Sequence, residues 1–258
     1  MNLFVLLKMV PDTVEELTVA EDQKQLEKEF LRLKLSDADE HALEQALLLK
    51  EKSGGAVTVA TLDAPEVDDV LFTALAKGAD RAVKIGAPQD STGVATAARS
   101  FAELIKGGAA SVAPDTLVLV GTQAYDDLEG ELVPWLAHAL QLPSLSVICA
   151  VSLAGGRATV LKEFSGGLRG EFEVALPAVL GIQSAEKPPR YVPIAKVRAI
   201  RKSAKIDSFA ASAPSEAPAV AADRMYKPEA AGRAKMLEGS SEELAERIVS
   251  LLTEHGVV

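Results

Sequence analysis

Four short apolar runs recur through the first 120 residues, and stretches with helical periodicity lie between them. The runs are LFVLL, AVTVATL, RAVKI and DTLVLV, and they show little alternation between apolar and polar positions. Such runs are typical of strands buried on both faces of a parallel sheet. The alternation of strands with helices therefore predicts a doubly wound, mostly parallel α/β unit over the first 150 residues.

The sequences between these runs carry helix start and stop signals. The stretch SDADEHALEQALLLKEK begins at Ser36, a residue type suited to the N-cap, with Asp39 three residues later, and ends at Gly54. A second helix stops at Gly78, and TGVATAARSFAELIKGG is a third. ELVPWLAHALQL is a fourth, with Pro134 in its early turns, where a missing N–H costs least.

The pattern changes after Pro143. SVICAVSLAGG, RATVLKEFSGG and LRGEFEVALPAVLGI alternate more strongly and are punctuated by Gly-Gly pairs, which predicts a meander of strands. A basic, proline-containing segment follows at about 184–205 and predicts an extended arm. We expect residues 1–205 to form one domain that includes the meander and the arm.

Residues 206–258 differ in composition from the rest of the chain. The stretch SFAASAPSEAPAVAA is rich in Ala, Ser and Pro, can bury little, and predicts a linker. The final stretch predicts a helix capped by Ser240 or Ser241, with Leu244, Ile248, Leu251 and Leu252 on its apolar face. A terminal helix after such a linker is expected to dock on another surface, such as that of a partner chain.

Charge and composition argue against several classes of protein. The net charge of −10 disfavours nucleic-acid binding, and no run approaches the roughly 18 apolar residues of a membrane span. The single cysteine, Cys149, suits a reducing compartment and is expected to fill the core. MNLFVLLK lacks the pattern of a signal peptide, so we expect a bacterial cytoplasmic protein, or a mitochondrial matrix protein only if a leader was removed.

Motifs for catalysis or metal binding are not found in the sequence. It has no G-x-G-x-x-G, Walker, G-x-S-x-G or paired-cysteine motif, and its three histidines are far apart. Asp126 and Asp127 are adjacent in a loop without an evident nucleophile or metal partner, so acid–base catalysis there is disfavoured. We predict no catalytic residue and no metal site.

Several segments together resemble the β subunit of electron transfer flavoprotein. They are VLLKMVPDT, SDADEHALEQALLLKEK, LFTALAKGADRAV, LVLVGTQAYDD, EFSGGLRGEFEVALPAVLG and PPRYVPIAKVRAIRK, in that order, followed by LEGSSEELAERIVSLL. The resemblance covers nearly the whole chain. It implies an adenine nucleotide hydrolase-like α/β fold with a C-terminal meander, an extended arm and a helix.

The resemblance also implies a function. Members of this family pair with an α subunit that holds most of one FAD, accept electrons from acyl-CoA-type or other flavin dehydrogenases, and pass them to a quinone reductase or another acceptor. This is electron transport by a carrier subunit rather than catalysis. Two alternatives remain open: a bifurcating β subunit with a second FAD of its own, and a nucleotide-binding protein of the universal-stress type.

Carried over by position, the resemblance predicts a nucleotide pocket. The expected contacts lie at Leu6, Ser36, Asp37, Ala38, Asp39 and Leu62, and in the loop at Gly121, Thr122, Gln123, Ala124, Tyr125, Asp126, Asp127 and Gly130. Thr13 would lie near the partner's FAD.

The chain departs from the family pattern where a phosphate would bind. Thr122 replaces a basic residue, Gly130-Glu131-Leu132 stand where Asn-Gln-Thr is usual in the AMP-binding type, and Glu129 adds a like charge. Asp37 also brings a charge where the family has proline. A phosphate needs N–H, hydroxyl or cationic donors, and these replacements remove several. The sequence therefore predicts that AMP binds weakly or not at all. The alternative left open is that another arrangement of the chain, or the α subunit, supplies the donors.

The resemblance also predicts a docking arm for the dehydrogenase. Its residues are Pro189, Arg190, Tyr191, Ile194 and Arg198, with Ile194 at the position of an apolar anchor. The alternative for this segment is a solvated basic strand.

Overall fold

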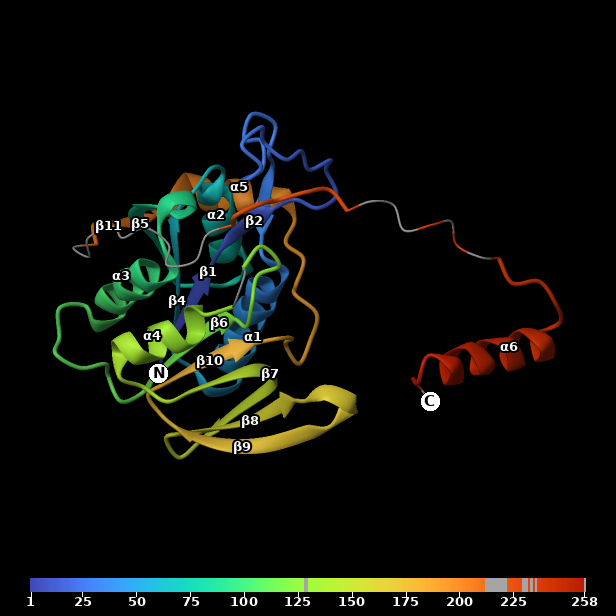
Figure 1. The fold of residues 1–258 in the computed structure, drawn as a ribbon. Helices are drawn as coiled ribbons and strands as arrows, with labels where there is room; N and C mark the ends of the chain where they lie inside the picture. The colour runs from blue at the N-terminus through green and yellow to red at the C-terminus, as the bar shows by residue number, and fades with distance from the viewer. Residues whose placement is uncertain (128–129, 212–221, 229–231, 233, 235, 258) are drawn as a thin grey trace.

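A central sheet organises the molecule (Figure 1). The computed structural model describes all residues except 128–129, 212–221, 229–231, 233, 235 and 258. Within the described residues, nine strands lie in the order β11-β5-β4-β1-β6-β10-β7-β8-β9. Their bounds are β1 Asn2–Leu7, β4 Ala56–Asp63, β5 Arg81–Pro88, β6 Thr116–Gly121, β7 Ser144–Ala154, β8 Arg157–Glu163, β9 Arg169–Ala175, β10 Ala178–Ile182 and β11 Asp207–Phe209. A short antiparallel pair, β2 (Met9–Pro11) and β3 (Leu33–Leu35), follows β1 and precedes α1.

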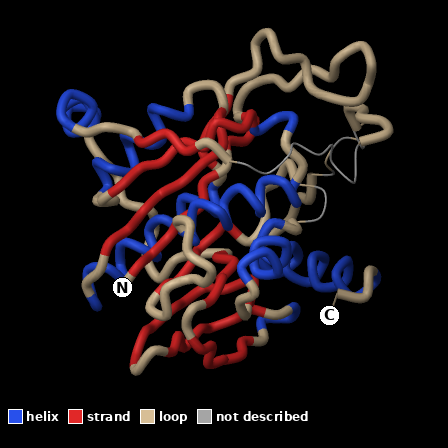
Figure 2. The backbone as a smooth tube through the Cα atoms, turned by 90° about the vertical axis from the view of Figure 1, so that its left-hand side faces the viewer, coloured by secondary structure: helices blue, strands red, loops and turns tan. Residues whose placement is uncertain are grey.

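Helices cover both faces of this sheet, as the turned view in Figure 2 shows. Their bounds are α1 Asp37–Ser53, α2 Val67–Lys77, α3 Val94–Lys106, α4 Leu132–Leu140, α5 Ile194–Ser203 and α6 Ser241–Glu254, with short 3-10 turns η1 Gln89–Ser91 and η2 Ser165–Gly167. Helices α1 and α2 pack in one hydrophobic cluster with the strands, and α3 and α4 pack in another. The prediction of a doubly wound α/β fold is confirmed.

The meander differs from the sequence prediction at one strand. LRGEFEVALPAVLGI was expected to be one strand of the meander, but it forms two strands joined by a turn with a cis Leu176–Pro177 bond. β9 is an antiparallel edge strand, whereas β10 lies in the middle of the sheet, parallel to both β6 and β7. The two strands differ in burial: every residue of Ala178–Ile182 is buried, while most side chains of β9 remain exposed.

The arm is not extended throughout, and the alternative of a basic strand is wrong. Residues 194–203 form helix α5, which packs against α2. The Arg201 guanidinium lies 5.2 Å from the centre of the Phe72 ring and pairs with Asp69. The prolines all precede the helix, at 188, 189 and 193, so none interrupts its hydrogen bonds.

The C-terminal region also contains a strand that its composition did not predict. Residues 207–209, which were assigned to the linker, form β11 at the edge of the sheet beside β5. Helix α6 begins with a capping box, in which Ser240 and Glu243 bond each other's backbone N–H. It lies apart from the body of the molecule (Figure 1), and the apolar side chains of Ile248, Leu251 and Leu252 are exposed on it. Most of the linker lies outside the described residues.

Candidate nucleotide pocket

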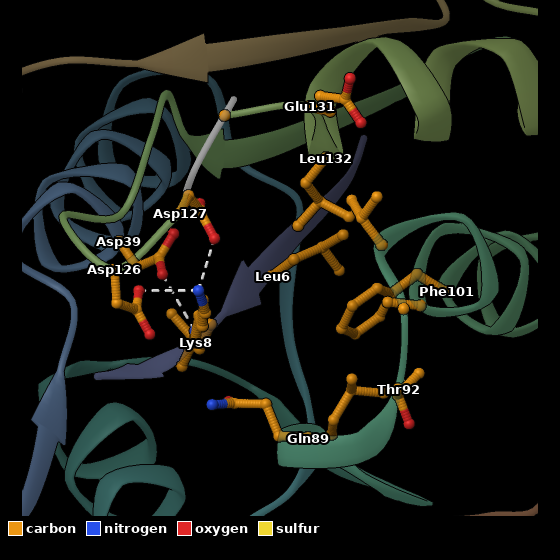
Figure 3. Close-up of a pocket in the computed structure, with 16 residues that line it drawn as sticks. Leu6, Lys8, Asp39, Gln89, Thr92, Phe101, Asp126, Asp127, Glu131 and Leu132 are labelled. Carbon is orange, nitrogen blue, oxygen red and sulfur yellow. Dashed lines mark hydrogen bonds and ion pairs between the residues drawn. The ribbon is translucent and has the colours of Figure 1, made fainter. Parts of the chain in front are cut away.

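A pocket of about 320 Å³ opens at the carboxyl edge of the sheet (Figure 3). Strand β1 pairs in parallel with β4 on one side and β6 on the other. The helix that leaves β1 and the helix that enters β6 lie on opposite faces. A crevice forms at such a switch point because the connections diverge there, and α/β proteins use it to bind ligands.

One wall of the pocket is apolar. Phe101, Leu6 and Leu132 gather on this wall in Figure 3. Leu62, Val94 and Ala97 complete it. The wall combines the ends of β1 and β4 with residues of α3 and the start of α4. It suits an apolar or aromatic body.

Asp39 closes the pocket from the side of α1. It is 4% exposed, and its two oxygens accept hydrogen bonds from the backbone N–H of Lys8 at 2.9 Å and of Gly121 at 2.7 Å. Residue 121 must be glycine here, because a Cβ at that position would lie 2.6 Å from the Asp39 Oδ1. Burial raises the pKa of Asp39 to about 7, against the opposing effect of the two N–H donors. The residue thus joins the ends of β1 and β6.

A three-residue charge cluster forms the polar wall. The Lys8 Nζ lies 2.7 Å from Asp126 Oδ1 and 2.5 Å from Asp127 Oδ1. The second oxygen of Asp127 accepts the backbone N–H of Ala124 at 3.0 Å, which fixes the turn. Burial lowers the pKa of Lys8, but attraction from both carboxylates outweighs burial and leaves that pKa above its usual range.

The structure brings together some of the expected pocket residues and not others. Leu6, Asp39, Leu62, Asp126, Asp127 and Gly130 line the pocket, whereas Ser36, Asp37, Ala38, Gly121, Thr122, Gln123, Ala124 and Tyr125 do not.

The expected residues that do not line the pocket have other contacts. Thr122 accepts the Val147 N–H at 3.1 Å, and Tyr125 donates to the Pro11 carbonyl. Ser36 occupies the N-cap position of α1, but its side chain makes no capping hydrogen bond, so the expected capping role is wrong.

Sequence reasoning missed the cation and several other residues that line the pocket. Lys8, Gln89, Thr92 and Phe101 line it and were not predicted. Gln89 holds the edge by exchanging two hydrogen bonds with the backbone of Met9, at 2.9 and 2.7 Å. A usable signal existed, because Lys8 and Gln89 directly follow two buried strands, and the carboxyl ends of parallel strands share one edge of a sheet.

The donor set does not fit a phosphate group well. Lys8 is already paired with two carboxylates, and Glu131 accepts a hydrogen bond from Trp135 Nε1 at 3.1 Å. At the start of α4, Pro134 has no N–H and the Trp135 N–H bonds the Glu131 carbonyl. The start of α4 therefore has few free backbone N–H groups to donate to an anion. Glu129 lies outside the described residues.

Comparison with known proteins decides the family. The model of the electron transfer flavoprotein domain matches residues 27–214. The chain belongs to the electron transfer flavoprotein family. It is similar to the "Electron transfer flavoprotein subunit beta" of Methylophilus methylotrophus, with 31% identity over 98% of each chain. The proteins of the same name from Bacillus subtilis and Syntrophomonas wolfei are 28% and 36% identical, over 100% of each chain and over 72% and 71% of the two chains.

The segment predicted to be a docking arm is anchored at its base. Arg190 donates to both oxygens of the buried Glu44 at 2.8 to 3.1 Å and to Glu51 at 2.7 Å. Arg190 is therefore turned toward the domain. Tyr191 and Ile194 remain 84% and 65% exposed, and Arg198 is exposed on α5. Pro189 is half-buried, and it precedes the anchor. Thr13 lies in the exposed segment after β2.

In the part of the chain that the structure describes, no helix is both long and apolar enough to cross a bilayer. The same residues contain no group of three or more histidine, cysteine, aspartate or glutamate side chains arranged to hold a metal ion. Cys149 is half-buried, and its thiol lies 3.3 Å from the Leu161 carbonyl oxygen.

Proposed function

We propose that this chain is the β subunit of a heterodimeric electron transfer flavoprotein. It carries electrons, through one FAD held mainly by an α subunit, from acyl-CoA-type or other flavin dehydrogenases to a quinone reductase or another acceptor, in a bacterial cytoplasm. The observation that carries the proposal is end-to-end similarity to a protein named as a β subunit, over 98% of both chains. The chain supplies surfaces and orientation, while the bound flavin supplies the redox chemistry.

Two exposed surfaces support this role. The first is the arm at Tyr191 and Ile194, which presents apolar side chains on a base fixed by Arg190. The second is the apolar face of α6, which the chain's own domain leaves exposed. Large exposed apolar groups on ordered elements are typical of protein contacts. We assign α6 to the α subunit and the arm to the dehydrogenase.

We further propose that the pocket holds AMP weakly or not at all. Two or three charge-assisted hydrogen bonds are missing, at roughly 1.5–3 kcal/mol each, which lowers the affinity by several powers of ten. The same shortage disfavours the bifurcating alternative, because the pyrophosphate of a second FAD needs more donors than AMP. We also place Thr13 near the partner's flavin, where its side chain cannot stack on the ring.

Coexpression with a cognate α-type subunit tests the heterodimer. We expect a yellow complex that reduces when a flavin dehydrogenase and its substrate are added. A colourless chain that purifies alone and binds a nucleotide would favour the universal-stress alternative instead.

Ile194→Ala tests the arm within that complex. The truncation should slow electron transfer from the dehydrogenase at least about fivefold while the FAD content stays normal, because an interface anchor typically contributes more than about 1 kcal/mol. Loss of FAD in this variant would show that Ile194 has a structural role. Leu168→Ala, at an exposed leucine of the meander that belongs to neither surface, serves as a control of similar size and exposure and should leave electron transfer unchanged.

A further inference from the structure

The segment that leads from β10 toward α5 is tied along its length to helix α1. Three of its backbone N–H groups donate to side chains of that one helix: Ala185 to His41 Nδ1 at 3.1 Å, Glu186 to Gln45 Oε1 at 3.1 Å and Arg190 to Glu44 Oε2 at 3.0 Å. The fully buried Gln45 also returns a hydrogen bond to the Glu186 carboxylate at 3.2 Å. These bonds fix residues 185–190, which we call the arm base, against the domain.

Glu44 makes the most directional of these contacts. It is 3% exposed, and the Arg190 side chain donates Nη2 to one of its oxygens at 2.8 Å and Nε to the other at 2.9 Å. A guanidinium that bonds both oxygens of a carboxylate is fixed in direction as well as in distance, because its donors form a planar fork. Glu44 therefore sets the point and the direction in which the chain leaves the domain at Tyr191.

The far side of the exposed turn is also fixed. Residues 191–193 separate the arm base from α5, which begins at Ile194 and packs against α2. The exposed side chains of Tyr191 and Ile194 lie between these two supports. Their relative placement consequently depends on the contact that Glu44 makes at the first support.

Stability alone does not account for this buried ion pair. Taking a carboxylate and a guanidinium out of water costs free energy, and apolar side chains of similar volume at such positions are often as stabilising or more so. A buried pair can instead fix one arrangement among several. The arrangement that Glu44 and Arg190 fix is that of the exposed apolar side chains that follow.

We propose that Glu44 is a positioning residue for docking: acting through Arg190, it holds Tyr191 and Ile194 in the arrangement that the dehydrogenase binds. The inference rests on the proposed function of the arm and adds the residue that sets its geometry. Without this carboxylate the arm adopts several arrangements, and the apparent affinity falls by the fraction that is competent to bind. Electron transfer within the docked complex is unchanged.

Steady-state kinetics test this role, with the purified heterodimer as electron acceptor of a flavin dehydrogenase that reduces the wild-type protein. Glu44→Gln should raise the KM for the heterodimer about tenfold, as expected if about a tenth of the arms are competent, and should leave kcat within about twofold. Glu51→Gln is the matched control, because it makes the same change on the same helix against the same Arg190, at an exposed position. It should change KM less than about twofold. An unchanged KM for Glu44→Gln, or a loss confined to kcat, would contradict the proposal.

A paired substitution separates positioning from stability. Glu44→Gln together with Arg190→Gln leaves no unpartnered buried charge, so most of the stability should return, but no guanidinium fork holds the arm. The KM should remain at least about fivefold above wild type, in line with the smaller competent fraction. If KM recovers together with stability, Glu44 has a structural role only and the proposal is overturned.

Two further measurements locate the cause of the effect. Amide hydrogen exchange over the arm base, measured on the paired variant without any electron transfer, should be at least about tenfold faster than in wild type. Unchanged exchange would show that the arm base stays in place without Glu44 and would overturn the proposal. Ile194→Ala, assayed beside Glu44→Gln, separates the two levels: if Ile194→Ala alone raises KM, the positioning role is wrong, and if neither variant does, the arm is not the docking surface and the proposed function of the arm fails as well.

Discussion

Asp39 should make the stability of this protein fall between pH 5 and pH 8. Its carboxyl group is buried, and burial raises its pKa from the ordinary 3.8 to about 7. The folded chain then binds a proton that the unfolded chain releases, so the free energy of unfolding decreases as the pH rises from about 4 to about 7 and is constant above that. Each pKa unit corresponds to about 1.36 kcal/mol, which makes the total contribution about 4 kcal/mol.

Asp39→Asn removes this titration and so isolates it. The amide offers one acceptor oxygen for the two N–H groups of Lys8 and Gly121, and this loss of about 1–2 kcal/mol is independent of pH. Relative to the variant, the wild-type chain should lose roughly 2–3 kcal/mol between pH 5 and pH 8. Stability would be measured by urea unfolding, followed through the fluorescence of the single tryptophan, Trp135.

The two N–H donors to Asp39 oppose the effect of burial on its pKa, and they define the result that would refute this prediction. Two backbone N–H donors stabilise the ionised carboxylate, and burial opposes ionisation. The difference in free energy of unfolding between wild type and Asp39→Asn would then stay constant within about 0.5 kcal/mol from pH 5 to pH 8 if the hydrogen bonds outweighed burial. That result would refute the reasoning. Asp207→Asn, which removes an exposed ion pair with Arg81, serves as the control and should show no such trend.

Two other substitutions test the packing around the site. Gly121→Ala should lower the free energy of unfolding, measured in urea, by about 3 kcal/mol, because the added Cβ would collide with Asp39. Gly86→Ala is the control: the nearest atom to its Cβ lies at 3.9 Å, so the loss should be under about 1 kcal/mol. Glu44→Gln should lower the free energy of unfolding by about 2 kcal/mol and speed proteolysis of the arm. Burial alone raises the pKa of Glu44, but the effect of Arg190 outweighs burial and lowers that pKa. The full loss is therefore expected above about pH 5, and it should shrink at lower pH as the wild-type carboxylate is protonated.

The elements of the doubly wound unit could be predicted because their signals are local. The apolar runs and the glycines after α1 and α2 fix strands and helix ends within a few residues of where they lie. The assignment failed where neighbours in space decided. The sequence predicts β10 as part of the meander, but its side chains are fully buried and the strand lies between β6 and β7.

The pocket depended on contacts that no local pattern encodes. Asp39 was read as part of a helix start, but its partners lie 31 and 82 positions away in the sequence. Lys8 and Asp126 are separated by 118 positions. The resemblance supplied the loop residues, whereas the pairing of Lys8 required the turn at Ala124 to be placed against the end of β1. Such pairs follow from strand order and not from spacing.

Inventory of the flavin and nucleotide in the purified heterodimer tests the central claim most directly. The complex would be denatured and its released FAD and AMP quantified against protein. A carrier subunit whose pocket lacks phosphate donors predicts about one FAD per heterodimer and under about a tenth of an equivalent of AMP. One equivalent of AMP, or two of FAD, would contradict the account.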